Sequence, residues 1–163
     1  MVFAMSARLH LLYGFAGSGK STLARQLERE LPAVRFTLDE WMLRLYPELT
    51  IEDDDYGRRA AAVRELIWSV AEQTLRTGSD AVLDWNAWSV ERRAWARTRA
   101  TAVGAEVVLH RLSTSLEEST RRAQERESSG AAFTHRITRA GNDHLAGLLE
   151  EPTAEEGLRI LEH

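Results

Sequence analysis

The stretch GFAGSGKST, residues 14–22, decides the fold of this chain. It matches the pattern G-x-x-x-x-G-K-[S/T] residue for residue, with the fixed positions at Gly14, Gly19, Lys20 and Ser21. An apolar segment at residues 8–13 precedes the stretch, and an amphipathic segment follows it at residues 19–31. Because the motif requires a strand before it and a helix after it, these flanks support the match.

The chemistry of this loop suits phosphate groups. Glycines let the backbone turn its N–H groups inward without a Cβ in the way, and the positive end of the following helix dipole adds to the attraction. Lys20 is expected to reach the outer phosphates as a point charge, and the Ser21 hydroxyl is expected to ligate Mg²⁺. We therefore expect a bound nucleoside triphosphate, ATP, with Mg²⁺. The predicted nucleotide-binding residues are Gly14, Phe15, Ala16, Gly17, Ser18, Gly19, Lys20, Ser21 and Thr22.

Length and composition narrow the class of protein. The 163 residues suit one domain, residues 1–163, and 44% apolar residues can build its core. The net charge is −4, whereas a general nucleic-acid binder is expected to be basic. The chain has no cysteine, which excludes disulfides and thiolate metal sites. No apolar run is long enough to span a membrane, and the N-terminus turns polar too early for a signal peptide. We expect a cytoplasmic monomer or homodimer. Residues 161–163 resemble the start of an expression-tag scar and support no inference.

Strand-like and helix-like segments alternate along the chain. Strands are expected at residues 8–13, 34–38, 81–84, 105–111 and 158–161. Helices are expected at residues 19–31, 39–46, 52–77, 90–103, 116–127 and 137–149, with Ser89 and Ser115 as N-caps. This alternation predicts an α/β fold, a three-layer sandwich with a parallel sheet and helices on both faces. Ligands in such folds bind beyond the carboxyl ends of the strands, so chemistry is expected there.

The second of these strand ends carries Asp39. A carboxylate opposite the phosphate loop can accept the proton of an acceptor hydroxyl and align it, which a phosphoryl-transfer enzyme needs. The alternative is that Asp39 only caps the helix that follows. Trp41 is a candidate for an apolar wall of the acceptor site. Arg44 is a candidate for binding an acceptor phosphate, or else is solvated.

The third strand ends in Asp84, followed by Trp85 and Asn86. Asp84 is a candidate to hold a Mg²⁺-bound water or to orient the acceptor; alternatively, its carboxylate takes loop amides. Trp85 and Trp88 are expected to flank the cleft, with Asn86 as a weaker candidate. Two further tryptophans, Trp68 and Trp95, stand at helical positions and are expected in the core, whereas Arg92 and Arg93 are expected on the surface.

A lid is expected at about residues 119–136. Arg122 and Arg126 are four apart and share one helix face, and a Ser-Ser-Gly break follows them at residues 128–130. Such arginines can close over a triphosphate and stabilise the charge of the transferring group. The alternative is a solvated face paired with Glu118 and Glu125. His135, Arg136 and Arg139 begin the return helix, and none of them is singled out.

Taken together, four segments resemble the zeta-toxin-like or AAA_33-type small P-loop kinases, which include chloramphenicol phosphotransferase-like enzymes and 5′-hydroxyl polynucleotide kinases. The segments are GFAGSGKST (14–22), TLDEW (37–41), VLDWNAWSVERRAW (82–95) and EESTRRAQER (117–126). The resemblance covers residues 8–157. It implies strand order 2-3-1-4-5, ATP·Mg²⁺ as donor and a hydroxyl as acceptor. It also implies roles for Lys20 and Ser21 at the donor and metal, Asp39 as base, and Arg122 and Arg126 in the lid.

Three functions remain open at this point. The first is a kinase acting on a small-molecule hydroxyl. The second is a 5′-hydroxyl polynucleotide kinase, which is disfavoured because Met42 stands where those enzymes often have an arginine three residues after the base. The third is an ATP-binding switch module without phosphoryl transfer. A small GTPase is excluded because no N-K-x-D sequence is present, and no Glu follows Asp84, which weakens a motor ATPase.

Overall fold

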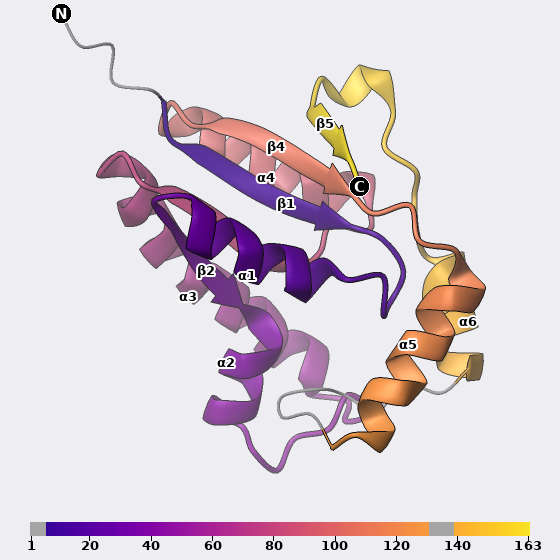
Figure 1. The fold of residues 1–163 in the computed structure, drawn as a ribbon. Helices are drawn as coiled ribbons and strands as arrows, with labels where there is room; N and C mark the ends of the chain where they lie inside the picture. Colours follow the sequence, from indigo (N-terminus) through magenta and orange to yellow (C-terminus); the bar gives the residue numbers. More distant parts are fainter. Residues whose placement is uncertain (1–5, 131–138) are drawn as a thin grey trace, which may run out of the picture.

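A parallel sheet forms the centre of the molecule (Figure 1). The computed structural model describes residues 6–130 and 139–163. All four strand pairings are parallel, in the order β2-β3-β1-β4-β5. The strands are β1 (Arg8–Tyr13), β2 (Ala33–Thr37), β3 (Asp80–Asn86), β4 (Glu106–Arg111) and β5 (Arg159–Glu162). The predicted α/β class and strand order are confirmed.

Six α-helices connect these strands in the described part of the chain, and a 3-10 turn at Ala154–Glu156 precedes β5. They are α1 (Lys20–Glu30), α2 (Leu38–Leu45), α3 (Tyr56–Arg76), α4 (Val90–Ala102), α5 (Leu116–Ser128) and α6 (Arg139–Gly147). The Ser89 and Ser115 hydroxyls accept the backbone N–H three residues on, so both predicted N-caps are confirmed. Helix α3 begins later than predicted because Asp53 accepts hydrogen bonds from the backbone and hydroxyl of Thr50, at 2.6 and 3.0 Å, which forms a turn. Among the described residues, no helix is both long and apolar enough to cross a bilayer.

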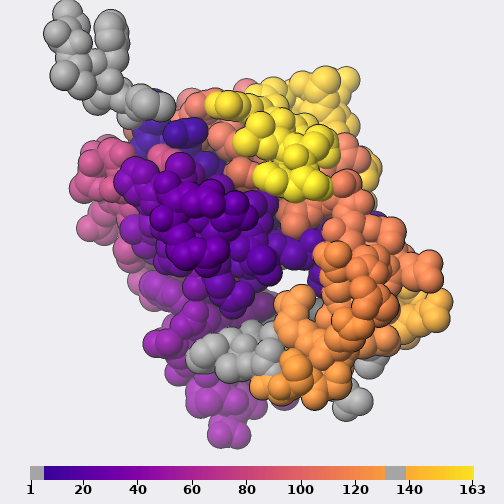
Figure 2. All heavy atoms as spheres, viewed as in Figure 1, coloured from indigo at the N-terminus to yellow at the C-terminus, as the bar shows by residue number. Residues whose placement is uncertain are grey.

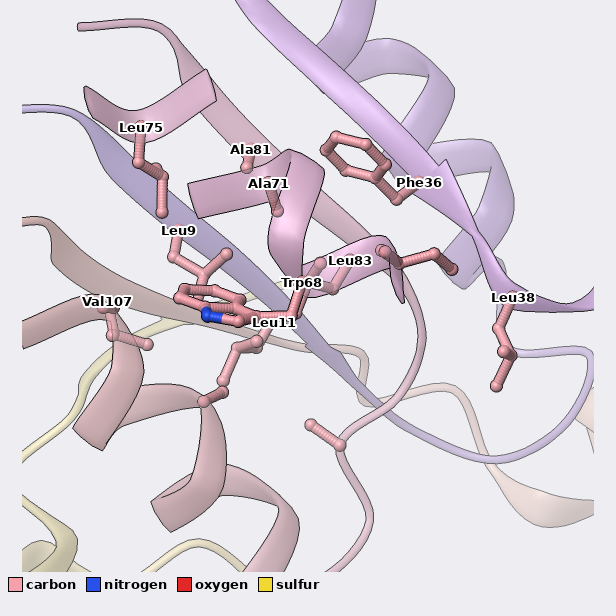
Figure 3. Packing of buried hydrophobic residues seen from close by; sticks show 14 of the residues in the cluster. Leu9, Leu11, Phe36, Leu38, Trp68, Ala71, Leu75, Ala81, Leu83 and Val107 are labelled. Atoms are coloured by element: carbon pink, nitrogen blue, oxygen red, sulfur yellow. The ribbon is translucent and has the colours of Figure 1, made fainter. Parts of the chain in front are cut away.

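The larger core lies between the sheet and the helices α3 and α4 (Figure 1). Leu9 and Leu11 of β1 meet the indole of Trp68 from α3, with Leu83 beside them (Figure 3). Trp68 also contacts Trp95 of α4 edge to face, with 5.8 Å between ring centroids. Trp68 is buried and Trp95 is partly buried against this core, which confirms the expectation for both.

The opposite face of the sheet carries α1 and a smaller apolar cluster (Figure 1). Leu12 and Val82 pack there against Ala24 of α1. The same face holds a buried network of polar side chains. Nδ1 of His10 lies 2.9 Å from Nε2 of His110, and Nε2 of His10 lies 3.1 Å from a carboxylate oxygen of Asp80.

Arg93 departs from the expectation of a surface residue. Its side chain is fully buried, because its guanidinium donates to both carboxylate oxygens of Glu156, at 2.7 and 3.0 Å. It also donates to the Ala87 carbonyl and lies over the ring of Tyr13. A guanidinium buried in this way is satisfied by its partners, so Arg93 joins α4 to the segment before β5 rather than facing solvent.

Candidate functional site

A cleft of about 410 Å³ opens at the carboxyl ends of the central strands. It lies between the phosphate loop, the start of α2, the inner face of α3 and α4, and the helices α5 and α6. The side chains and loop glycines that line it are Ala16, Gly17, Gly19, Lys20, Ser21, Leu38, Asp39, Tyr56, Ala60, Arg64, Asp84, Trp85, Asn86, Trp88, Arg92, Arg126, Leu145 and Leu149. The topology therefore brings most of the predicted site residues to one place.

The phosphate loop adopts a backbone that only glycine takes easily. Gly17 and Gly19 have φ angles of +84° and +101°. A Cβ at Gly17 would stand 2.1 Å from the backbone oxygen of Ser119, in the second turn of α5. This glycine therefore serves both the shape of the loop and its close contact with the helix that was expected to form a lid.

Lys20 lies at the first position of α1 and is held within the loop. Its ammonium donates to the carbonyl oxygens of Gly14 and Phe15, at 2.9 and 2.6 Å. Burial lowers the pKa of Lys20 to about 8; Asp84 raises it, Arg126 lowers it, and Asp39 raises it. A triphosphate would replace the carbonyls with anionic partners.

Asp84 faces the start of α1 and is buried at the end of β3. Its Oδ1 accepts a hydrogen bond of 2.9 Å from the Ser21 hydroxyl, and its Oδ2 accepts one of 3.0 Å from Arg35. A hydroxyl and a carboxylate oxygen are the hard ligands that Mg²⁺ selects beside phosphate oxygens, so the pair fits a nucleotide-bound magnesium ion. No group of three or more His, Asp or Glu side chains in the described ranges could hold a metal ion by itself.

A bulge in β3 shapes the floor of the cleft. His10 of β1 lies opposite Val82, but Leu12 lies opposite Asn86, so β3 carries extra residues in between. Asn86 donates to the Gly14 carbonyl at 2.8 Å, while its own buried carbonyl oxygen has no hydrogen-bond partner among the described residues. This unpaired acceptor is the kind of group that a bound ligand satisfies.

Asp39 lies in the first turn of α2 and is exposed at the rim of the cleft. Tyr56, at the start of α3, lines the same cleft, and burial together with the charge of Asp39 raises the pKa of Tyr56 to about 12. Its hydroxyl therefore stays protonated. The structure places the Asp39 carboxylate in the cleft that Lys20 also lines.

Apart from its contact with the phosphate loop at Gly17, the helix α5 is separated from α1 by an opening (Figure 2). Arg126 lines the cleft from this helix. Arg122 is exposed and donates to Glu118 at 2.7 Å, and Arg121 pairs with Glu118 and Glu125. Of the two arginines predicted for the lid, the structure therefore brings Arg126 to the site and pairs Arg122 on its own helix. His135 and Arg136 lie outside the described residues.

Trp41 and Arg44 lie outside the lining of this cleft. Trp41 packs on Phe36 with 6.5 Å between ring centroids, and Arg44 forms an ion pair with Glu40 at 2.6 Å. Both line a separate depression between α2 and α3 that also contains Leu66. The helical turn of α2 explains this difference. Trp41 and Arg44 lie two and five residues after Asp39, so their side chains leave the helix in other directions than the Asp39 carboxylate.

Three charged or polar side chains of the site were not predicted: Arg35, Tyr56 and Arg64. A fourth, Arg92, was expected on the surface and instead is half-buried in the cleft, with its guanidinium 5.0 Å from the ring centre of Trp88. Of these four residues, only Arg35 could have been predicted from the sequence. Side chains alternate between the two faces of a strand, and this alternation places Arg35 of β2 on the same side of the sheet as Asp84.

The sequence matches the profile of the AAA_33 family, described as an AAA domain, over residues 9–150. The chain belongs to the AAA_33 family. This match spans the phosphate loop, Asp39, Asp84 and the helix α5. A comparison of this AAA_33 chain with curated proteins gave no match.

Solved structures share the fold of this AAA_33 chain. A provisionally assigned kinase from Chloroflexus aurantiacus superposes with a TM-score of 0.74 and 18% identity, over 97% of this chain and 88% of that one. A protein of the Pnkp1/Rnl/Hen1 RNA repair complex gives 0.72 and 21% identity, over 88% of this chain and 44% of its own length. Kti12 of Chaetomium thermophilum, solved with ADP-AlF3, gives 0.68 and 19% identity, over 94% and 88%. The AAA_33 chain thus has the P-loop fold and spans less than half of the RNA repair protein.

Proposed function

We propose that this AAA_33 chain is an ATP-dependent phosphotransferase that moves the γ-phosphoryl group of ATP to a hydroxyl of a small-molecule acceptor. One observation carries the proposal: Lys20 of the phosphate loop and the carboxylate of Asp39 line the same cleft. A group that grips a triphosphate and a group that takes a proton then face one reacting centre. Similarity to a provisionally assigned kinase and to a protein solved with ADP-AlF3 supports the donor side.

In the proposed reaction, the acceptor oxygen forms a bond to the γ-phosphorus as the bond from that phosphorus to the bridging oxygen of ADP breaks. The hydroxyl proton passes to a carboxylate oxygen of Asp39, and the electron pair of the broken bond leaves with ADP. The products are ADP and a phosphate ester. Lys20 and Arg126, which line the cleft, would offset the negative charge of the transferring group.

Ser21 and Asp84 would hold the magnesium ion of the nucleotide. When bound, Mg²⁺ neutralises charge on the phosphate oxygens. Arg35 keeps the Asp84 carboxylate turned toward Ser21, because it donates to the second oxygen of that carboxylate. Arg122 would join the lid only after its ion pair with Glu118 is broken.

A 5′-hydroxyl polynucleotide kinase is the second candidate. The similarity to a protein of an RNA repair complex favours it. The net charge of −4 and Met42 in place of an arginine after Asp39 count against it.

The test is a transfer assay with γ-labelled ATP and Mg²⁺. Nucleosides, sugars, hydroxylated antibiotics and 5′-hydroxyl oligonucleotides are offered as acceptors, with Asp39→Asn as the blank. Labelled product that depends on Asp39 supports the proposal. Nucleotide-dependent function that survives Asp39→Asn, without a labelled product, would instead identify a switch module.

A further inference from the structure

Two arginines line the cleft from α3 and α4, the helices that pack on the larger core. Arg64 comes from α3 and Arg92 from α4, and both are half-buried. Both also line an adjoining cavity of about 730 Å³, which Trp85 and Trp88 share. The donor cleft and this cavity therefore share a wall that contains the two guanidiniums, and Glu65, Glu91 and Glu150 also line the cavity.

Neither arginine has an acidic partner in the described residues. No ion pair and no side-chain hydrogen bond joins Arg64 or Arg92 to a carboxylate, whereas Arg93 next to them binds Glu156 with two hydrogen bonds. The nearest acid to Arg64 in sequence, Glu65, is engaged by Arg99 at 3.0 Å and by the Trp95 indole at 3.1 Å. Among the described residues, Glu65 and Glu91 act on Arg64 and Arg92 through space only, so no ion pair ties up either half-buried guanidinium.

The two guanidiniums also repel one another. Burial lowers the pKa of Arg92 to about 10, and the charge of Arg64 adds to this; burial likewise lowers the pKa of Arg64. Both remain protonated at neutral pH. Glu91 and Glu65 offset part of this effect but form no ion pair with Arg92 or Arg64 in the described residues, so an anion bound between the two guanidiniums would relieve their repulsion.

Their geometry also selects the kind of anion. A guanidinium presents paired N–H groups that match a carboxylate or a phosphate. The stacking of Arg92 over Trp88, at 5.0 Å, limits the orientations of that fork. Trp85 and Trp88 supply apolar walls for the carbon skeleton of a small molecule.

We propose that the acceptor is a small hydroxylated anion, whose carboxylate or phosphate group is bound by Arg64 and Arg92 while its hydroxyl is presented to Asp39. This rests on the proposed phosphotransferase function and adds the class of its acceptor. The bound anion fixes the orientation of the alcohol, which lowers the entropic cost of reaching the reactive arrangement.

The experiment compares matched acceptors with the full-length chain, γ-labelled ATP and Mg²⁺. Each set holds a neutral alcohol, its carboxylate and its phosphate: glycerol, glycerate and glycerol 3-phosphate; glucose, gluconate and glucose 6-phosphate. We expect kcat/KM to be at least about tenfold higher for an anionic member than for its neutral partner, and the preferred anion separates a carboxylate from a phosphate site. A 5′-hydroxyl oligonucleotide preferred over every small anion would overturn the proposal in favour of a nucleic acid acceptor.

Variants assign the effect to the two arginines. Arg64→Gln and Arg92→Gln should each raise the KM of the anionic acceptor about tenfold or more, with the KM of ATP changed less than twofold. Arg76→Gln is the matched control, because Arg76 lies on the same helix as Arg64 but pairs with Glu72 on the exposed side. The proposal would be overturned if neutral and anionic acceptors gave equal kcat/KM values, or if the substitutions raised the KM of ATP and left the KM of the acceptor unchanged.

A binding arm separates this inference from the proposed function. Titration calorimetry measures glycerate and orthophosphate binding with the phosphate loop saturated by a non-hydrolysable ATP analogue. Binding that Arg64→Gln and Arg92→Gln abolish, without transfer to any acceptor, would support the anion site and contradict the kinase. Transfer to neutral alcohols without anion binding would support the kinase and contradict the anion site. If neither anion binding nor transfer is observed, both the kinase and the anion site are overturned.

Discussion

The hydroxyl of Ser21 donates a hydrogen bond of 2.9 Å to Oδ1 of Asp84, across 63 positions of sequence. This contact joins the phosphate loop to the end of the neighbouring strand β3. It places a hydroxyl and a carboxylate side by side where the nucleotide's magnesium ion would bind.

Asp84→Asn keeps the size of the side chain and removes its charge. We expect the Mg²⁺ concentration for half-maximal phosphoryl transfer to rise about 10–100-fold, the range typical for loss of groups that orient a metal site. Nucleotide binding in EDTA should change little. A magnesium titration of both proteins measures this, and identical curves would remove Asp84 from the metal site.

Lys20 is the single lysine of the chain, so its ionisation can be followed directly. Burial holds the pKa of Lys20 at about 8 in the nucleotide-free protein. Reductive methylation with ¹³C-formaldehyde labels Lys20 and the N-terminal amine, and the lysine signal should titrate near pH 8. ATP should move this titration upward, because phosphate oxygens stabilise the charged ammonium. If the lysine signal of the free protein titrates near pH 10.5, or if ATP does not shift its titration, the buried environment described for Lys20 is contradicted.

The two lid arginines should differ in effect. Arg126 lines the cleft, whereas Arg122 is held by Glu118 on its own helix. Arg126→Ala should therefore reduce kcat more than Arg122→Ala, by up to about 10³-fold if it acts as an arginine finger. Steady-state kinetics at saturating ATP measures both, and the opposite order would show that Arg122 turns inward when nucleotide binds.

Acid should weaken the fold through the buried histidines. Burial lowers the pKa of His110 to about 4 from 6.5, and burial also lowers that of His10. Between these two values the unfolded chain binds a proton that the folded chain rejects, so stability is present above pH 6.5 and is lost as the pH falls toward 4. The loss through His110 amounts to about 3 kcal/mol at most.

Urea unfolding between pH 7.5 and 4 measures this loss. His110→Gln should flatten the pH dependence, while His144→Gln, at an exposed position of α6, should leave it unchanged. If the free energy of unfolding falls equally with pH in the unmodified protein and in both variants, the buried histidines do not control the loss of stability in acid.

Local patterns predicted the elements of this fold well. Each strand of the sheet lies within two residues of the expected position because apolar runs mark the strands, and the N-caps Ser89 and Ser115 mark where α4 and α5 begin. The phosphate loop followed from a motif that carries its own geometry.

The rest of the site depends on contacts that sequence spacing does not encode. Arg93 looks like a surface residue until Glu156, 63 positions away, is folded against it. Arg64 and Arg92 meet only because α3 and α4 pack side by side on the same face of the sheet. The spacing of Arg122 and Arg126 indicated a shared face and left open whether Glu118 would pair with one of them, which it does with Arg122.

The central claim is that Asp39 accepts the proton of an alcohol while the phosphate loop holds ATP. Asp39→Asn preserves shape and hydrogen bonding but removes the base, so a single-turnover assay with γ-labelled ATP and the best acceptor measures the claim directly. We predict a rate lower by about 10²–10⁴-fold, with ATP affinity within a factor of two of the unmodified protein. An unchanged rate of transfer in Asp39→Asn would contradict it.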